Sequence, residues 1–249
     1  MEIRDRIAIV TGAGSGIGRA TSIALSQAGA RGVVLADVDE EALAETAPPV
    51  EAAGAAALCV RCDVRRAADW IGLLDIAEEA FGRVDILHNN AGLSSGTPYW
   101  PDISLERIEA LVDVNLKGVL LGTRLGVERM RLSGGGAIVN TASVAAHAPL
   151  PPEAIYCATK AGVAMFTKCC AQLAGSHGVR VNCVCPGVTE TPMLRKTGTD
   201  GQMADYLEPV YEALLPLAPE AIAAAVIALI EDEKAAGEVV DVLNEARAS

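Results

Sequence analysis

The chain has 249 residues, of which 51% are hydrophobic and 21% are charged, and its formal net charge is −12. This apolar fraction supports a sizeable core and does not fit a disordered chain. The acidic balance, with no basic run longer than Arg65 and Arg66, argues against nucleic acid and anionic membrane surfaces as partners.

The N-terminus and the cysteines indicate the compartment. The first residues, MEIRDRIAIVTG, lack the pattern of a secretory signal, and no apolar run approaches the roughly 20 residues of a membrane span. Seven cysteines, an odd number, stand in a chain large enough to fold without disulfides. Cys59 and Cys62 form a lone C-x-x-C without the partners of a zinc site. We therefore expect a cytoplasmic protein without a metal ion.

Short apolar segments alternate with alanine-rich helical segments along the whole chain. Strands are expected at residues 6–10, 33–36, 57–61, 86–88, 137–141, 179–185 and 238–242, and helices at 16–28, 40–53, 68–81, 105–131, 154–177 and 219–232. Nearly continuous apolar strands are typical of a sheet covered on both faces. The pattern predicts an α/β, Rossmann-type doubly wound parallel sheet of about seven strands, with helices on both faces, in a single domain over residues 1–249.

Residues 190–217 fit neither pattern. This segment contains Pro192, Pro209 and Pro216 among scattered apolar residues. Long irregular segments inside compact domains are often functional and cover binding sites. We therefore expect a substrate-binding lid here.

A glycine-rich turn, TGAGSGIG at 11–18, follows the first strand. It does not match G-x-G-x-x-G, but it fits T-G-x-x-x-G-x-G with Gly12, Gly16 and Gly18. Because the glycines have no side chains, such a turn lets a pyrophosphate approach the backbone N–H groups of a helix N-terminus. Ser15 can add a hydroxyl donor. A merely tight strand-to-helix connection is the alternative.

Asp37 ends the second strand and bears on the choice of cofactor. A carboxylate at this place can accept hydrogen bonds from ribose hydroxyls, and it would repel the 2′-phosphate of NADP. Arg19 is the one basic residue of the turn, against Asp37 and Asp39. These residues favour NAD over NADP, unless Asp37 only caps the following helix.

Tyr156 and Lys160 stand four residues apart in PPEAIYCATK at 151–160. On a helix this spacing places both side chains on one face, about one turn apart. They form either an ordinary surface contact or an acid–base pair, in which the lysine charge lowers the pKa of the phenol. The spacing alone does not decide between the two.

In their order and spacing these features resemble the short-chain dehydrogenase/reductase family over most of the chain. The resemblance rests on TGAGSGIG at 11–18, Asp37, CDV at 62–64, NNAG at 89–92, Asn115, Ser143, Tyr156 with Lys160, and PG at 186–187. It implies an NAD(H)-dependent oxidoreductase that interconverts a secondary alcohol and a ketone by hydride transfer. The sequence around Tyr156, IYCATK at 155–160, and the C-terminal end of the chain are similar to the hydroxyprostaglandin-dehydrogenase branch of the family.

The family resemblance also implies a role for each matching residue. Tyr156 would be the general acid/base, with Lys160 lowering its pKa and binding the nicotinamide ribose, and Ser143 would donate to the substrate oxygen. Asn115 would anchor a water molecule of a proton relay, or would only kink its helix. The implied cofactor contacts are Gly12, Ser15, Gly16, Ile17, Gly18, Asp37, Asp63, Val64, Asn90, Ala91, Gly92, Tyr156, Lys160, Pro186, Gly187, Thr189 and Thr191.

The substrate side of the site is less defined. Candidates are Glu153, His147, Leu93 and Met193, which would give a mixed, moderately apolar pocket for a secondary, lipid-like or sugar alcohol. Glu153 either faces the substrate and disfavours anions or only supports a helix N-terminus.

Two further expectations concern assembly and the competing functions. The last strand, in GEVVDVLN at 237–244, lacks the Gly-Gly that is common at this place in the family, so the tail should pack differently. The resemblance nevertheless implies a homodimer or homotetramer. A non-catalytic dinucleotide-binding regulatory protein and an S-adenosylmethionine methyltransferase are the alternatives, and neither needs Ser143, Tyr156 and Lys160 together.

Overall fold

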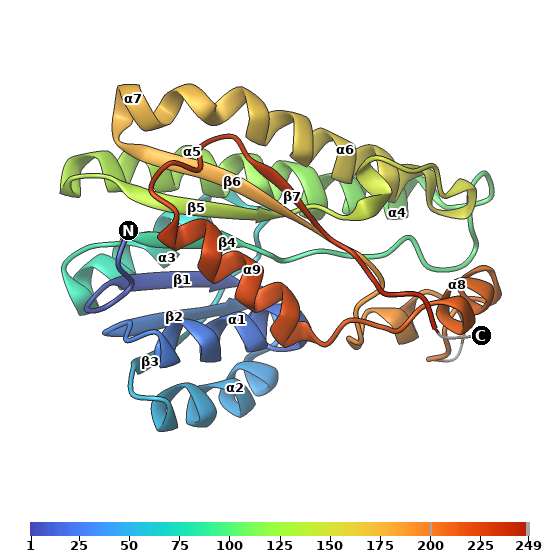
Figure 1. Cartoon of the computed structure of the whole chain (residues 1–249), viewed down its shortest axis with the longest axis horizontal. Helices are drawn as coiled ribbons and strands as arrows, with labels where there is room; N and C mark the ends of the chain where they lie inside the picture. The colour runs from blue at the N-terminus through green and yellow to red at the C-terminus, as the bar shows by residue number, and fades with distance from the viewer. Residues whose placement is uncertain (200, 248–249) are drawn as a thin grey trace.

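The computed structural model describes residues 1–199 and 201–247, so residue 200 of the expected lid segment and the last two positions of the expected 1–249 domain lie outside it. The described strands form one parallel sheet in the order β3-β2-β1-β4-β5-β6-β7 (Figure 1). They are β1 (Ile7–Thr11), β2 (Gly32–Asp37), β3 (Ala56–Arg61), β4 (Ile86–Asn89), β5 (Gly136–Thr141), β6 (Val179–Pro186) and β7 (Val239–Val242). The predicted doubly wound α/β fold is confirmed.

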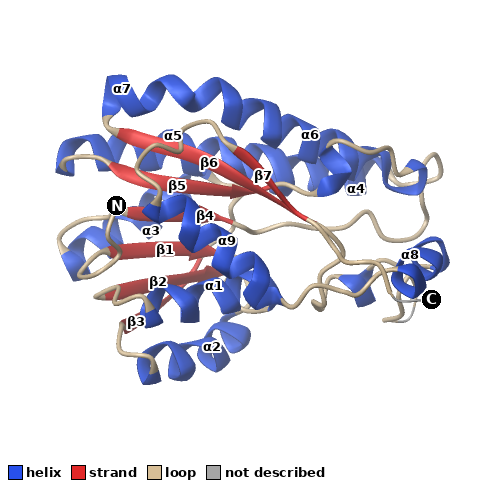
Figure 2. Cartoon of the chain, in the orientation of Figure 1, coloured by secondary structure: helices blue, strands red, loops and turns tan. Residues whose placement is uncertain are grey.

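Helices cover both faces of the sheet (Figure 2). One layer holds α1 (Gly16–Gln27), α2 (Glu40–Ala52) and α9 (Pro219–Glu231), and the other holds α3 (Ala67–Phe81), α4 (Leu105–Val112), α5 (Gly118–Met130) and α6 (Ala154–Cys169), which continues into α7 (Leu173–His177). Leu25, Leu43 and Ile222 fill the first core, and Trp70 and Leu74 fill the second. Because both faces are covered, the central strands β1, β4 and β5 are buried along their whole length.

The parallel register brings the candidate residues to one edge of the sheet. The strand order reverses between β1 and β4, and ligands of open α/β sheets bind beyond the carboxyl ends of the strands at such a switch point. The glycine turn follows β1, the NNAG run follows β4, and Ser143 follows β5. All of these segments therefore leave the sheet at the same end.

The helix expected at 105–131 is interrupted. A π-helical turn, Asp113–Lys117, separates α4 from α5, and a 3₁₀ turn, Arg131–Ser133, ends the run. A π turn holds an extra residue and changes which backbone groups are paired, and such turns often lie at functional sites. Asn115 is the central residue of this turn, so the interruption falls on a predicted site residue.

Residues 190–217 contain short helical pieces joined by irregular chain. These are the 3₁₀ turns Leu194–Lys196 and Asp205–Leu207 and the helix α8 (Glu208–Ala213). The C-terminal tail packs on the end of this segment, where Leu215 N donates to Glu245 O at 2.8 Å and Arg247 N donates to Ala213 O at 2.9 Å. Figure 1 shows both beyond the carboxyl ends of the strands.

Among the helices of residues 1–199 and 201–247, none combines the length and apolarity that a bilayer crossing requires.

Candidate active site

A cleft of about 810 Å³ lies at the carboxyl edge of the sheet. It brings together most of the residues predicted from the sequence. Those that line it are Gly12, Ser15, Gly16, Ile17, Asp37, Asp63, Val64, Asn90, Ala91, Gly92, Leu93, Ser143, Glu153, Tyr156, Lys160, Pro186, Gly187, Thr189, Thr191 and Met193. Gly18, Asn115 and His147 are predicted site residues that do not line it.

The glycine turn has the geometry that an anion-binding helix N-terminus needs. Gly12 and Gly16 have φ values of +65° and +51°, a region that side chains disfavour. A Cβ on Gly18 would lie 2.0 Å from the Gly12 carbonyl oxygen. Ser15 is the N-cap of α1 but makes no side-chain capping bond, so it leaves the first-turn N–H groups free for an outside acceptor. The turn therefore fits a cofactor pyrophosphate.

Asp37 lies at the cleft and is held by backbone donors. Its Oδ2 accepts from Gly14 N at 3.0 Å and its Oδ1 accepts from Val38 N at 2.7 Å. The helix α2 is capped by a different residue, Asp39, whose Oδ1 accepts from Ala42 N at 3.0 Å. The alternative that Asp37 only caps the next helix is therefore wrong.

Arg19, which contacts Gly14, and Arg65, which lines the cleft, are both already engaged. Arg19 Nη2 donates to Gly14 O at 2.6 Å and pairs with Glu45 at 3.0 Å. Arg65 pairs with Asp63 at 2.6 Å, and its hydrogen bonds lower the pKa of that carboxyl. Neither arginine offers its charge freely beside Asp37.

The NNAG run is fastened to the first strand. The Thr11 hydroxyl accepts from the backbone N–H of Asn90 at 3.0 Å and of Ala91 at 3.2 Å. The Asn90 side-chain amide donates back to Thr11 O at 3.0 Å. These bonds fix the floor of the cleft between β1 and β4.

Asn115 does not line the cleft itself but binds Leu93, which does. Its Oδ1 accepts from Leu93 N at 2.7 Å and its Nδ2 donates to Leu93 O at 2.8 Å, so the amide pairs with the backbone as a strand would. The side chain is fully buried, and it also reaches Thr159 Oγ1 of α6 at 3.4 Å. Asn115 thus holds the chain that follows NNAG against the helix of Tyr156.

Lys160 is a buried cation directed at the end of β5. Its Nζ donates to Thr141 O at 2.8 Å and lies 5.6 Å from the centre of the Tyr156 ring. Burial lowers the pKa of Lys160 to about 8. Sequence reasoning missed Thr141, because its contribution is a backbone carbonyl that no side-chain pattern can indicate.

Tyr156 and Ser143 both line the cleft. Burial raises the pKa of Tyr156 to about 12, and the Ser143 hydroxyl opposes this rise. The expected lowering by Lys160 is not seen in the protein alone, because removing the phenolate from water is the dominant effect. Ser143 extends from β5, and its Oγ also accepts from Ala145 N at 3.2 Å.

Glu153 ties the 190–217 segment to the opposite wall of the cleft. Its side chain is buried, with Oε1 accepting from the Tyr206 hydroxyl at 2.6 Å and Oε2 accepting from Ser95 N at 3.0 Å. The Tyr206 ring packs edge-to-face on Tyr99, with 5.3 Å between the ring centres. Glu153 makes no capping bond to α6 and instead bridges two segments across the cleft.

We expect Glu153→Ala to raise the KM for substrate about tenfold or more. The change leaves the Tyr206 hydroxyl and the Ser95 N–H without their buried acceptor, which costs roughly 1–3 kcal/mol per group. Steady-state kinetics and tryptic cleavage after Arg195 and Lys196 would report the loosening. Tyr211→Phe, which removes the other tyrosine hydroxyl of the segment, is the control, and equal KM values in Glu153→Ala and wild type would contradict this role.

The structure places His147 away from the cleft. Its Nε2 lies 3.2 Å from Asp241 Oδ1 on β7, so the imidazole faces the edge of the sheet.

Asn244, which the sequence did not single out, is closer to the site. Its side chain accepts from Val188 N at 2.8 Å and donates to Val188 O at 2.7 Å, which holds the loop after β6 to the tail.

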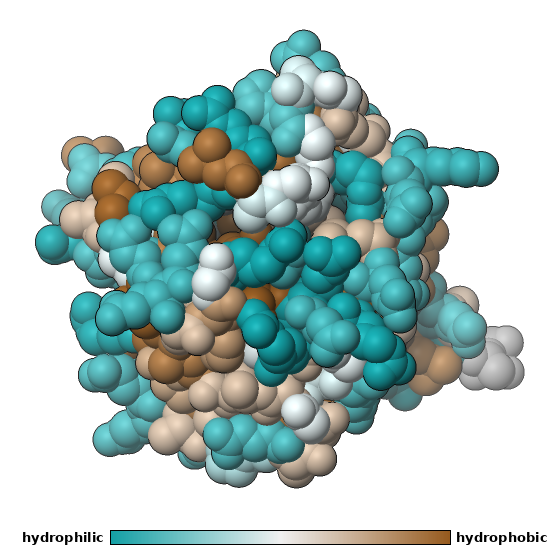
Figure 3. All heavy atoms as spheres, turned by 90° about the vertical axis from the view of Figure 1, so that its left-hand side faces the viewer, coloured by the Kyte–Doolittle hydropathy of each residue, from teal (hydrophilic) through white to brown (hydrophobic). Residues whose placement is uncertain are grey.

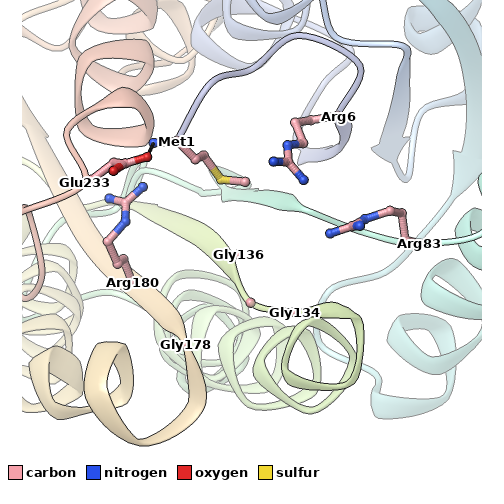
Figure 4. Close-up of a pocket in the computed structure, with 9 residues that line it drawn as sticks. Met1, Arg6, Arg83, Gly134, Gly136, Gly178, Arg180 and Glu233 are labelled. Atoms are coloured by element: carbon pink, nitrogen blue, oxygen red, sulfur yellow. Dashed lines mark ion pairs between the residues drawn. The ribbon is translucent and has the colours of Figure 1, made fainter.

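A second cavity, of about 240 Å³, lies where the strands begin (Figures 3 and 4). Figure 4 shows three arginines around it, and each is already engaged. Arg6 and Arg83 share the buried carboxylate of Asp85, and Arg180 donates to carbonyls at the end of α9, including Ile230 O at 2.5 Å. Arg6, Arg83 and Asp85 join the starts of β1 and β4, and Arg180 joins β6 to the end of α9.

Comparisons with known proteins agree with this geometry. The model of the family described as short chain dehydrogenase matches residues 6–202. The 15-hydroxyprostaglandin dehydrogenase [NAD(+)] of Rattus norvegicus is 34% identical over 97% of this chain and 92% of its own. The crystal structure of a 3-ketoacyl-(acyl-carrier-protein) reductase from Brucella melitensis, complexed with NADH, superposes with a TM-score of 0.85 at 30% identity, covering 96% of this chain and 97% of that one.

The chain therefore belongs to the short-chain dehydrogenase family, whose members bind a nicotinamide dinucleotide. Some relatives are much longer than this chain. The "Probable oxidoreductase EphD" of Mycobacterium tuberculosis (strain ATCC 25618 / H37Rv) is 34% identical over 92% of this chain, which spans only 40% of that protein.

Proposed function

We propose that this protein interconverts a secondary alcohol and a ketone with NAD(H), using Tyr156 as the general acid/base. The observation that carries the proposal is the arrangement of Ser143, Tyr156 and Lys160 along the same cleft that the glycine turn enters. Asn115 supports the arrangement by joining the chain at Leu93 to α6.

In this mechanism each side chain has one task. Ser143 donates a hydrogen bond to the substrate oxygen and orients it. Tyr156, which lines the same cleft as Ser143, takes the hydroxyl proton in oxidation and returns it in reduction. Lys160 holds a positive charge close to the phenol ring and stabilises the phenolate. When bound, the nicotinamide ring supplies the hydride acceptor or donor.

The cofactor would lie along the cleft from Asp37 to Lys160. The uncapped N-terminus of α1 would bind its pyrophosphate, and Asp37 would bind the adenosine ribose. Asp63 and Val64 would face the adenine, and Pro186, Gly187, Thr189 and Thr191 would line the nicotinamide. NAD is preferred over NADP in this proposal, because Asp37 carries a negative charge here and the charges of Arg19 and Arg65 are engaged by Glu45 and Asp63.

Asp37→Ala should narrow the preference for NADH over NADPH by about tenfold or more. The change removes a carboxylate that would repel a 2′-phosphate and that would bind the ribose hydroxyls. Fluorescence titrations with both reduced cofactors measure the ratio of dissociation constants. Glu41→Ala is the matched control, because it removes an exposed carboxylate of α2 that does not line the cleft. An unchanged ratio in Asp37→Ala would contradict the assignment.

Residues 190–217 form the substrate lid in this proposal. Leu93, Met193 and Tyr206 give the cleft a mixed, partly apolar wall, and Glu153 links this wall to the lid. A neutral alcohol of moderate size fits such a wall better than a small hydroxy acid. Cyclohexanol, a 3β-hydroxysteroid and a 15-hydroxyprostaglandin form a suitable first panel of substrates.

The proposal extends to location and assembly. All seven cysteines are free thiols, which fits a reducing, cytoplasmic setting. Leu105 on α4 and Met165 on α6 expose apolar side chains, at 74% and 60% of their surface, and these helices would pair in a homodimer. No nucleic acid or membrane partner is proposed.

A non-catalytic dinucleotide-binding protein of the same fold remains the competing function. It would bind NADH but oxidise no alcohol of any panel. The buried Lys160 beside Tyr156 disfavours it, because burying an unneeded cation costs stability.

A further inference from the structure

Three side chains of metal-binding type meet beside the cleft. His147 follows the 3₁₀ turn Val144–Ala146, Cys185 lies on β6, and Asp241 lies on β7 as the register partner of Cys185. One ligand atom from each residue lies within 4.8 Å of the other two. None of the three lines the cleft, so this cluster is separate from the proposed site of hydride transfer.

The spacing of these atoms suits a small tetrahedral ion. Zinc bound at the usual distances to nitrogen, oxygen and sulfur needs its ligand atoms roughly 3.3–3.6 Å apart. His147 Nε2 and Asp241 Oδ1 are already 3.2 Å apart. Both side chains are 42% exposed, so they can rotate toward the buried Cys185 sulfur and close the remaining gap.

We propose that His147, Cys185 and Asp241 form a Zn²⁺ site with its fourth position open to water. Imidazole, thiolate and carboxylate are the ligands that zinc uses in proteins, whereas Mg²⁺ and Ca²⁺ are bound by oxygen alone. The sequence could not indicate this site, because the three residues lie far apart in the chain and form no spacing motif.

A bound ion would join three segments that border the cleft. His147 lies four residues after Ser143 in the loop that leaves β5, and Cys185 directly precedes Pro186 and Gly187, which line the cleft. Asp241 adds the edge strand β7. Because an ion that binds only the folded chain stabilises it, the Tm should rise with zinc concentration.

The test is a Co²⁺ titration of the full chain after removal of metal, in a Cys59→Ser background that disables the C-x-x-C pair. We expect one Co²⁺ per chain, with the absorption of a thiolate-to-cobalt charge transfer, and displacement by Zn²⁺. His147→Ala and Asp241→Asn should each weaken binding about 100-fold or more, since even groups that only orient ligands contribute roughly 10–100-fold.

One control variant keeps the result specific. His177→Ala removes another imidazole, which is half-buried and bonds to the neighbouring Ser176, and it should leave the affinity unchanged. Cys185 is buried, so Cys185→Ser can unfold the chain, and the two exposed ligands carry the test instead. Absence of stoichiometric Co²⁺ binding, or affinities in His147→Ala and Asp241→Asn equal to that of the parent, would overturn the proposal. So would loss of binding in His177→Ala.

Discussion

Tyr156→Phe should lower the turnover number by roughly 10²–10⁴-fold, the usual contribution of a general acid/base. The change removes one oxygen from a half-buried ring that keeps its place beside Lys160. The hydroxyl proton of a substrate held by Ser143 then has no group to accept it. Initial rates of cofactor reduction with a secondary alcohol measure the loss.

NADH binding separates this loss from a structural defect. The affinity of Tyr156→Phe for NADH, measured by fluorescence, should stay close to that of the wild type, because the pyrophosphate and adenosine parts of the cleft are unchanged. Tyr211→Phe removes a lid hydroxyl instead and should keep full turnover. If Tyr156→Phe retained most of its activity, the phenol would not be the proton-transfer group.

The pKa of Tyr156 also gives the direction of the pH dependence. Burial raises it to about 12, so at neutral pH the protonated phenol dominates in the protein alone. Oxidation needs the phenolate, whose fraction grows with pH, so its rate should increase with pH up to about 8, where Lys160 begins to lose the charge that stabilises the phenolate. Reduction needs the phenol and should gain nothing from higher pH.

Gly18→Ala should weaken NADH binding by more than about tenfold and destabilise the fold by roughly 1–3 kcal/mol, as overpacking does. The new methyl carbon would lie 2.0 Å from the Gly12 carbonyl oxygen and 2.8 Å from Asn90 Nδ2. Both neighbours belong to segments that frame the cofactor cleft, so the turn must open. NADH titration and denaturant unfolding measure the two effects.

Gly72→Ala is the matched control for this prediction. Gly72 lies inside α3, and nothing stands within 4 Å of the position that its Cβ would take. Alanine favours a helix over glycine by about 1 kcal/mol, so this variant should be slightly more stable and should bind NADH normally. Wild-type NADH affinity in Gly18→Ala would show that the close approach to Gly12 has no bearing on the cofactor.

The fold and much of the site follow from local sequence. The strands are short apolar runs, and the glycine turn needs residues without Cβ, so both leave a pattern in consecutive residues. Tyr156, Lys160 and Ser143 were recognised through their order in a known family rather than through any local rule.

The remaining features depend on contacts between distant segments. Asn115, in the π turn, is held by the hydrogen bonds of its side-chain amide to the Leu93 backbone. The burial of Glu153 depends on Tyr206 and Ser95. The tail reaches the site only because Asn244 pairs with Val188. None of these partners is near its counterpart in sequence, so no spacing could predict them. The rise in the pKa of Tyr156 that burial causes, opposite to the predicted lowering by Lys160, likewise depends on the folded surroundings of the ring.

Transfer of deuterium from alcohol to cofactor tests the central claim most directly. Each secondary alcohol of the panel, labelled with deuterium on its carbinol carbon, is incubated with the protein and NAD⁺, and the reduced cofactor is analysed by mass spectrometry. The account predicts that at least one alcohol gives NADH carrying one deuterium with the wild type, and that Tyr156→Phe gives almost none. NADH bound with normal affinity but never formed from any labelled alcohol would contradict it and would favour the non-catalytic alternative.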